Sequence, residues 1–202
     1  MFKDLKIIKL ENRVLLKIKG EDSREFLQAL VTNNINFISN EKSIYAALLS
    51  PQGKYLYDFF IFQDSKSNCL TIDCEKNSYQ ELVQKLTIYK LRSNVEITIQ
   101  DSIDVYTIFG LDLIKFISNL KMVYQEGYTK NLSDNLFFID PRNKSLGVRV
   151  YSNNLPNEFK EIGSGILSDW HYLRIKNKIP YPYKDLEKEK SFIIENNFEQ
   201  IN

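Results

Sequence analysis

The sequence predicts an α+β protein in which antiparallel sheets pack against helices. Two observations lead to this fold class. An aromatic-rich β-hairpin is expected over residues 43–63. The elements of residues 1–100 run strand–helix–hairpin–strand–helix–strand, which is neither strict βαβ alternation nor an all-β order. Residues 101–202 repeat this style with shorter elements, and the 202 residues together are enough to bury a core without disulfides or metals.

The hairpin has two apolar runs on either side of Pro51-Gln52-Gly53. Proline presets φ and glycine permits a positive φ, so this tripeptide predicts a turn between two strands. Asp58 is the polar exception in the second run. A buried carboxylate is costly unless it is paired, hydrogen-bonded or facing a ligand. Asp58 therefore lies either on the solvated face of an edge strand or in the wall of a pocket that the hairpin forms.

The remaining elements of the first half follow from periodicity and from end signals. A strand at 13–19 ends at Gly20, and Asp22 or Ser23 can cap the helix that follows. That helix carries an apolar stripe and is expected to end at 32–34. After the hairpin we expect a strand at 68–73, a helix at 77–91 and a strand at 95–99.

A change of composition near residues 100–102 marks the start of the second half. There we expect strands at 105–109, 122–124, 136–139 and 147–151, and helices at 111–120 and 168–177. Asp140-Pro141-Arg142 predicts a turn, and Pro180 and Pro182 should stop the last helix. The expected division is a first subdomain at 1–100, a second at 101–160, and a returning helix and tail at 161–202.

Charge and cysteine usage restrict the class of protein. The net charge of +1 provides no global electrostatic reason to bind nucleic acid, and no run of eighteen apolar residues predicts a membrane span. Cys69 and Cys74 lie five residues apart along an expected strand, too far for a disulfide, so both should be reduced. We expect a soluble, cytoplasmic protein that binds neither nucleic acid directly nor a membrane.

The motifs of several enzyme classes are absent from the sequence, including glycine-rich phosphate loops, HExxH and GxSxG. His171 is the single histidine and cannot build a metal site by itself. We therefore expect no catalytic residues and no metal site, although the enzyme question stays open. Trp170 and Arg174 are one helical turn apart, and an indole with a guanidinium suits a flat heteroaromatic ligand with an anionic tail. Alternatively, Trp170 anchors the core.

Several blocks occur in an order that is specific when taken together. Residues 15–35 read Leu-Leu-Lys-Ile-Lys-Gly-Glu-Asp-Ser-Arg-Glu-Phe-Leu-Gln-Ala-Leu-Val-Thr-Asn-Asn-Ile, and residues 47–54 read Ala-Leu-Leu-Ser-Pro-Gln-Gly-Lys. Later blocks are Tyr-Lys-Leu-Arg at 89–92, Asp-Pro-Arg at 140–142, Leu-Gly-Val-Arg at 146–149, the stretch 170–180, and Glu-Asn-Asn-Phe at 195–198. Over essentially its whole length the chain thus resembles the YgfZ/GcvT family of folate-binding proteins, in its iron–sulfur branch.

The resemblance implies the aminomethyltransferase fold and tetrahydrofolate or a derivative as the cofactor. It implies support of iron–sulfur cluster assembly or repair, and indirectly of tRNA modification, with iron–sulfur assembly or client proteins as partners. Trp170, Arg174 and Arg142 lie in matching blocks and are expected folate-binding residues. Asp58 and Tyr57 align with an acidic pair of the aminomethyltransferases, and Tyr57 in place of an acid argues against aminomethyl transfer. One-carbon transfer assisted by Asp58 and a degenerate scaffold are the alternatives.

Two departures from the family pattern are visible. The Lys-Gly-Cys signature is due just beyond Ile201, and the barrel domain that follows it in the family is also lacking, so we expect a truncated relative. Lys176 and Lys178 stand where the family usually has an acid and a glycine. A lysine cannot accept the hydrogen bonds that the donor edge of a pterin offers.

Overall fold

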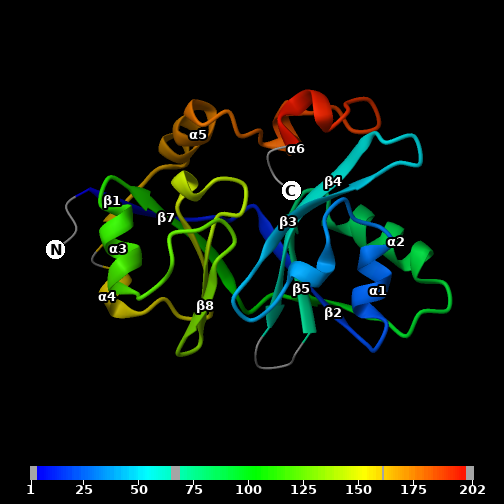
Figure 1. The fold of residues 1–202 in the computed structure, drawn as a ribbon, viewed down its shortest axis with the longest axis horizontal. Helices are drawn as coiled ribbons and strands as arrows, with labels where there is room; N and C mark the ends of the chain where they lie inside the picture. The colour runs from blue at the N-terminus through cyan, green and yellow to red at the C-terminus, as the bar shows by residue number, and fades with distance from the viewer. Residues whose placement is uncertain (1–3, 65–68, 161, 199–202) are drawn as a thin grey trace. The chain divides into compact units, whose positions relative to one another are not determined.

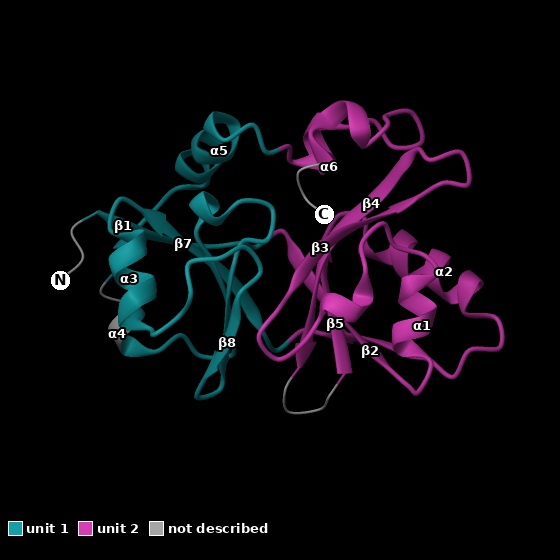
Figure 2. Ribbon diagram, viewed as in Figure 1, with its two compact units in different colours: residues 1–11, 102–179 teal, residues 12–101, 180–202 magenta. Residues whose placement is uncertain are grey.

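A computed structural model describes residues 4–64, 69–160 and 162–198, and the chain divides into two compact units (Figures 1 and 2). Unit 1 comprises Met1–Glu11 and Ser102–Ile179, and unit 2 comprises Asn12–Asp101 and Pro180–Asn202. Each unit contains a largely antiparallel sheet with packed helices, so the predicted α+β class is confirmed. The division differs from the expected three parts, because residues 1–11 group with 102–179 and residues 180–202 group with 12–101.

The sheet of unit 2 is fully antiparallel and has the strand order β3-β4-β5-β2-β6. Its strands are β2 (Arg13–Lys19), β3 (Ile44–Leu49), β4 (Tyr55–Asp64), β5 (Cys69–Glu75) and β6 (Glu96–Gln100). Its helices are α1 (Ser23–Gln28), η1 (Ile35–Phe37), α2 (Tyr79–Lys90), α6 (Pro182–Asp185) and η3 (Ile194–Asn196).

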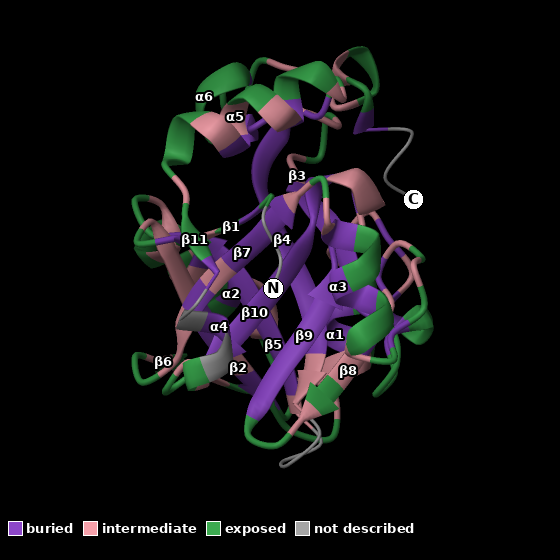
Figure 3. Cartoon of the chain, turned by 90° about the vertical axis from the view of Figure 1, so that its left-hand side faces the viewer, coloured by how far each residue is buried: buried purple, intermediate pink, exposed green. Residues whose placement is uncertain are grey.

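The two faces of this sheet differ in chemistry because side chains alternate along each strand. One face is apolar and joins the core cluster that includes Phe59, Ile72 and, from α2, Leu82. The residues next along the strands, such as Asp58 and Asp73, point to the opposite face. That face is also buried, as the central strands in Figure 3 show, so its polar groups need internal partners.

The sheet of unit 1 has the strand order β11-β1-β7-β10-β9-β8, in which β11 runs parallel to β1 and the other pairs are antiparallel. Its strands are β1 (Leu5–Lys9), β7 (Asp104–Gly110), β8 (Thr129–Leu132), β9 (Asn135–Ile139), β10 (Val148–Ser152) and β11 (Gly163–Ser164). Its helices are α3 (Leu113–Asn119), η2 (Lys144–Leu146), α4 (Asn157–Lys160) and α5 (Leu167–Lys176). Phe116 of α3 and Phe159 of α4 pack in one cluster with Phe137 of β9.

Most of the expected elements are confirmed. The strand at 13–19 has the predicted bounds, and the hairpin pairs β3 with β4 in a register that sets Ala47 opposite Asp58. The first helix is shorter than expected and ends at Gln28, although Leu30 and Val31 still pack against the core. Asp22 precedes this helix but does not cap it with its side chain, which instead accepts a hydrogen bond from the Asn94 amide.

The expected strand at 122–124 is wrong. Lys121 adopts a positive φ of 52°, which ends α3 and sends the buried Met122 back toward it. The strand that pairs with β9 comes later, at β8. The sequence also did not predict β1, β11, α4 or α6, which are short or are defined by distant partners. The expected signature position beyond Ile201 lies outside the described residues.

Candidate functional site

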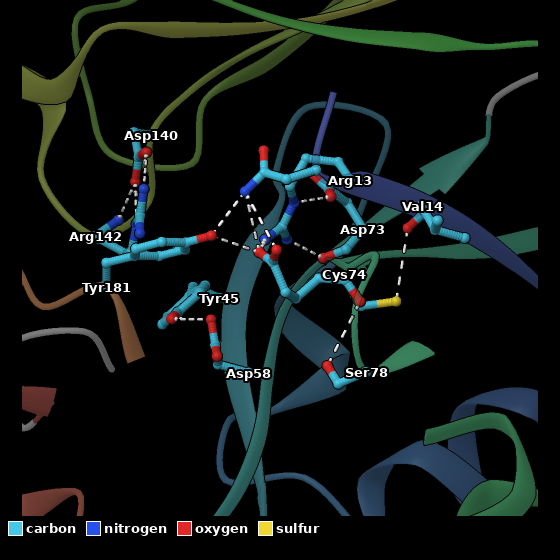
Figure 4. Close-up of polar contacts among 12 residues, drawn as sticks. Arg13, Val14, Tyr45, Asp58, Asp73, Cys74, Ser78, Asp140, Arg142 and Tyr181 are labelled. Atoms are coloured by element: carbon cyan, nitrogen blue, oxygen red, sulfur yellow. Dashed lines mark hydrogen bonds and ion pairs between the residues drawn. The ribbon is translucent and has the colours of Figure 1, made fainter. Parts of the chain in front are cut away.

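Asp58 lies on β4, which pairs with β3 on one side and β5 on the other. Its side chain is held by two phenols, because Tyr45 donates to Oδ2 at 2.5 Å and Tyr55 to Oδ1 at 2.6 Å (Figure 4 draws the Tyr45 bond). Only 9% of the residue is exposed. The interpretation of Asp58 as a solvated residue on an edge strand is therefore wrong, and its place in a pocket wall stays a prediction.

The Tyr55 phenol remains a donor across the physiological range. Burial raises the pKa of Tyr55 far above its ordinary value, and the neighbouring Asp58 carboxylate raises it further. A phenol that keeps its proton can donate to the carboxylate, whereas a phenolate could not. The arrangement therefore keeps both Asp58 oxygens engaged as acceptors of strong, charge-assisted hydrogen bonds.

A second polar cluster lies in unit 2, around Arg13. Its Nε lies 2.6 Å from Asp73 Oδ1, and its Nη1 lies 3.4 Å from Glu75 Oε2 (Figure 4). Tyr181 donates to Glu75 at 2.8 Å, and Asn12 donates to the Tyr181 hydroxyl at 2.7 Å. Burial disfavours the Arg13 cation, but Asp73 and Glu75 outweigh burial and raise its pKa. Burial also raises the pKa of Glu75, against the opposing effect of Arg13.

Tyr57 is directed away from Asp58. Its ring belongs to the core cluster on the helix side of the sheet, and its hydroxyl donates to Glu81 on α2 at 3.3 Å. Lys188 donates to the same hydroxyl at 2.7 Å and also pairs with Glu81. Successive residues of a strand point to opposite faces. The structure therefore does not bring Tyr57 and Asp58 together on one side of the sheet.

In unit 1, Arg142 forms a buried ion pair with Asp140 (Figure 4). Arg142 Nε donates to Asp140 Oδ1 at 2.9 Å and Nη2 donates to Oδ2 at 2.7 Å. The two residues thus form a bidentate pair within one turn. The Arg142 Cζ also lies 5.6 Å from the centre of the Trp170 ring. Trp170 is 5% exposed, and within the part of the chain that the structure describes its Nε1 has no hydrogen-bond partner.

Arg174 lies one turn after Trp170 on α5 and is also buried. Its Nε donates to Nδ1 of His171 at 2.9 Å, and its Nη1 donates to the Ile179 carbonyl at 3.3 Å. Both of these partners are local, because His171 is on the same helix and Ile179 follows its end. Lys176, at the position where the family usually has an acid, is exposed.

The five residues expected at the site therefore belong to two units. Trp170, Arg174 and Arg142 are in unit 1, and Asp58 and Tyr57 are in unit 2. Inside unit 1, Arg142 and Trp170 come together as ring and cation. The sequence interpretation missed the polar partners in unit 2: Arg13, Tyr45, Tyr55, Asp73, Glu75 and Tyr181. The alternation of polar residues in 71–75 could have indicated a second buried face, but not which residues would pair across it.

The described residues contain no group of three or more His, Cys, Asp and Glu side chains arranged to hold a metal ion. None of the helices that the structure describes is both long and apolar enough to cross a membrane. A groove of about 790 Å³ in unit 2 is lined by residues of α1 and of the segment around the end of α2, among them Phe26, Tyr89 and Arg92. It contains none of the five expected residues.

The fold identifies the structural class of the chain. The structure resembles the crystal structure of the glycine cleavage system aminomethyltransferase T from Bartonella henselae, with a TM-score of 0.61 over 88% of this chain and 47% of that one. The sequence identity is 10%, so the likeness establishes the aminomethyltransferase fold alone. The expectation of this fold is confirmed. No family model matches the chain.

Curated relatives are similar in sequence along most of the chain. The mitochondrial iron–sulfur cluster assembly factor IBA57 homologue of Dictyostelium discoideum is 25% identical over 97% of this chain and 54% of its own length. The mouse mitochondrial assembly factor IBA57 is 24% identical over 96% of this chain and 56% of its own length. The homologues are thus iron–sulfur cluster assembly factors, as the resemblance implied, and the chain spans about half the length of these relatives.

The expected cytoplasmic location is wrong. The relatives are named as mitochondrial proteins, and this points to a mitochondrial rather than a cytoplasmic location. The expectation relied on the lack of a long apolar run and on two cysteines expected to be reduced. Neither observation distinguishes the cytoplasm from a mitochondrion, and mitochondrial transit peptides are amphipathic rather than continuously apolar.

Proposed function

We propose that this protein binds a reduced folate at Trp170 of unit 1 and takes part in iron–sulfur cluster assembly. The observation that carries the folate proposal is the buried Trp170 indole, whose N–H has no acceptor within the described residues. A buried donor left without a partner costs free energy, and such groups in native proteins call for an explanation. A bound ligand with a carbonyl or ring-nitrogen acceptor would satisfy this one.

The surroundings of Trp170 support a flat, polar ligand. The Arg142 guanidinium lies by the indole ring, and its bidentate bond to Asp140 fixes its orientation. Guanidinium and indole groups both stack on aromatic rings. A pterin is flat and carries acceptor atoms on its rim, so the arrangement fits one edge of a folate. Lys176 cannot accept from the donor edge, which must then find backbone or carboxylate acceptors.

The other three residues expected to bind folate have no part in ligand binding in this proposal. Arg174 donates to His171 and to the Ile179 carbonyl, so in this proposal it shapes the end of α5 rather than binding an anionic tail. Asp58 and Tyr57 are in unit 2 and are not needed for the proposal. Aminomethyl transfer is not proposed, because the structural likeness to an aminomethyltransferase extends to the fold only.

The iron–sulfur proposal comes from the relatives, which are named as iron–sulfur cluster assembly factors and match along almost the whole chain. Because the chain spans about half of each relative, the activity of the whole relative is proposed for this chain and not assigned to it. Radical enzymes that modify tRNA contain iron–sulfur clusters, so weaker tRNA modification is the expected indirect effect of losing the protein.

A titration with reduced folates, followed by the fluorescence of the lone tryptophan, tests the ligand. Saturable quenching is expected. In calorimetry, Trp170→Phe should bind about tenfold or more weakly, because it retains an aromatic ring but loses the N–H donor. Tyr172→Phe, at an exposed position of the same helix, is the matched control and should bind like the wild type. A folded protein that gives no quenching and no heat would contradict folate binding and favour the scaffold alternative.

Depletion of the protein in its own cells tests the iron–sulfur part separately. The activities of iron–sulfur enzymes should fall. The activity of an enzyme from the same compartment that contains no iron–sulfur cluster should not change. Wild-type protein should restore them. If Trp170→Phe restores them fully while failing to bind folate in vitro, assembly does not need the ligand. If depletion changes neither class of enzyme, the assembly role is wrong.

A further inference from the structure

Residues 186–198 of unit 2, here called the C-terminal strap, pair with the start of β4. The Glu189 amide donates to the Tyr55 carbonyl at 2.8 Å, and the Tyr55 amide donates to the Ser191 carbonyl at 2.9 Å. One residue further on each side, Lys54 and Phe192 form an isolated antiparallel bridge. The Lys54 ammonium also lies 3.2 Å from the centre of the Phe192 ring. The strap is thus fixed to the backbone of Tyr55.

The strap also contacts the second phenol of the Asp58 cluster. The ring of Phe198 lies 5.9 Å from that of Tyr45, and Phe198 is buried. Tyr45 contacts Phe60 of the same sheet face at 4.9 Å. The Tyr45 ring is therefore bounded by the sheet and by the end of the strap. Lys188, directly before the strap residue that bonds to Tyr55, adds bonds to Tyr57 and Glu81.

These contacts converge on one carboxylate. Tyr45 and Tyr55 are the two donors to Asp58, and the strap contacts both of them, one through its backbone and one through its ring. A hydrogen bond weakens steeply with distance and angle, so a small shift of either tyrosine would leave a buried carboxylate with too few donors. Whether the strap is ordered on β4 and whether Asp58 keeps both donors are therefore coupled.

We propose that Tyr45 and Tyr55 are positioning residues for Asp58 and that the C-terminal strap fixes both of them, so that release of the strap frees the carboxylate. The device lies entirely in unit 2 and does not depend on folate binding. It goes beyond the proposed function by describing how one acidic group is kept engaged or made available. Because coupling of this kind is reciprocal, it can be tested from either end.

The test from the strap uses Glu189, which has a φ of +64°. Glu189→Pro removes the amide that donates to Tyr55 and cannot adopt this φ. Glu189→Gly keeps the amide and adopts a positive φ freely, so it is the matched control. The readouts are hydrogen exchange of the Tyr55 amide and the 13C carboxyl signal of Asp58, assigned with Asp58→Asn. Glu189→Pro should speed the exchange about tenfold or more and shift the carboxyl signal, whereas Glu189→Gly should do neither.

The test from the carboxylate uses Tyr55→Phe, which removes one donor and leaves the ring. Exchange of the Glu189 amide should become about tenfold faster, and in an Asp58→Asn background Tyr55→Phe should have little further effect. Tyr79→Phe is the control. Among the described contacts, the Tyr79 hydroxyl accepts a hydrogen bond only from the exposed side chain of Gln80. An unchanged carboxyl signal after strap release in Glu189→Pro would overturn the proposal. If that variant does not fold, unchanged Glu189 exchange in Tyr55→Phe would overturn it.

Discussion

Each unit of this protein buries an arginine against carboxylates, and the two clusters are built differently. In unit 1, Arg142 pairs with Asp140 two residues earlier, within a single turn. In unit 2, Arg13 of β2 pairs with Asp73 and Glu75 of β5, about sixty residues away. The local pair is visible in the sequence as Asp-Pro-Arg. The distant one exists because the antiparallel register places Arg13 opposite Glu75.

The difference concerns what each pair stabilises. A pair inside one turn closes that turn and orients a side chain, here the Arg142 guanidinium beside Trp170. A pair between strands contributes to strand pairing, and through Tyr181 the Arg13 cluster also attaches the returning chain to the sheet. We therefore expect the loss of Arg13 to affect the stability of unit 2 and the loss of Arg142 to affect the Trp170 site. The following variants test this distinction, from the largest expected effect to the smallest.

The largest effect is expected for Arg13→Met. It would remove the cation that pairs with the fully buried Asp73 and with Glu75, and breaking a buried pair in this way costs about 3–5 kcal/mol. Denaturant unfolding followed by circular dichroism would measure it. Lys17→Met, on the same strand and in the half-buried pair with Asp64, is the matched control and should cost less than about 1 kcal/mol. Equal losses in both variants would contradict a special role of the Arg13 cluster.

Arg142→Met should destabilise the protein less, by about 2–3 kcal/mol. The backbone amide of residue 142 would still donate to Asp140, so the carboxylate keeps one partner. Folate binding should be lost together with the ordered Arg142 side chain, which calorimetry on the folded variant would show. Arg142→Lys keeps the charge but not the bidentate geometry and should restore stability more than binding. Restoration of both to the wild-type level would mean that charge alone matters at this position.

A smaller, pH-dependent effect is expected at Glu75. Burial raises its pKa in the folded protein above the ordinary value of 4.5, despite the nearby Arg13. Over the pH range from that ordinary value up to the raised one, the folded state holds more protons than the unfolded state. Its contribution to the free energy of unfolding therefore decreases as pH rises through this range.

Glu75→Gln is the variant that isolates this effect. The wild type should lose stability relative to Glu75→Gln as the pH is raised from about 4 to about 7, measured by denaturant unfolding at each pH. The comparison cancels the titration of the other carboxylates. A difference between the two proteins that stays constant or grows in favour of the wild type would contradict the raised pKa.

The smallest effect is expected for Lys9→Met. Lys9 of β1 pairs with Asp104 of β7 in unit 1 at 2.8 Å, but the two side chains are 47% and 40% exposed. Solvent screens such pairs, so no change in the denaturant midpoint beyond experimental error is expected. A clear loss of stability would show that the exposed pairs of unit 1 contribute more than the contrast with Arg13 allows.

Much of the fold could be predicted, because it depends on local pattern. The Pro51-Gln52-Gly53 turn and its two apolar runs define β3 and β4 without further information. The errors have tertiary causes. The segment 122–124 has the composition of a strand but follows α3 directly through a positive φ, and β1 finds its partner β7 about a hundred residues later.

The residues expected at the folate site stay predictions, but the structure shows which of them lie near one another. Trp170 and Arg142 were expected at one site and do lie together in unit 1, although the contact is between distant parts of that unit. Arg174 was expected from its helical spacing to Trp170 and from a matching block, and Tyr57 from its alignment with an acidic pair. In the structure Arg174 bonds to His171, and Tyr57 bonds to Glu81 and Lys188. Alignment does not specify the direction of a side chain, which for Tyr57 alternates from one residue to the next along the strand.

By itself the sequence determined the α+β class, the hairpin, the Asp-Pro-Arg turn and the unusual placement of Asp58 in an apolar run. These depend on backbone propensity and on hydrophobic periodicity, which act over a few residues. Only the tertiary structure decided that two tyrosines engage Asp58, that Arg13 meets Asp73 and Glu75, and that the C-terminal strap returns to Tyr55. These contacts depend on the strand register and on the C-terminal residues packing back against the sheet. Both result from the packing of the whole chain.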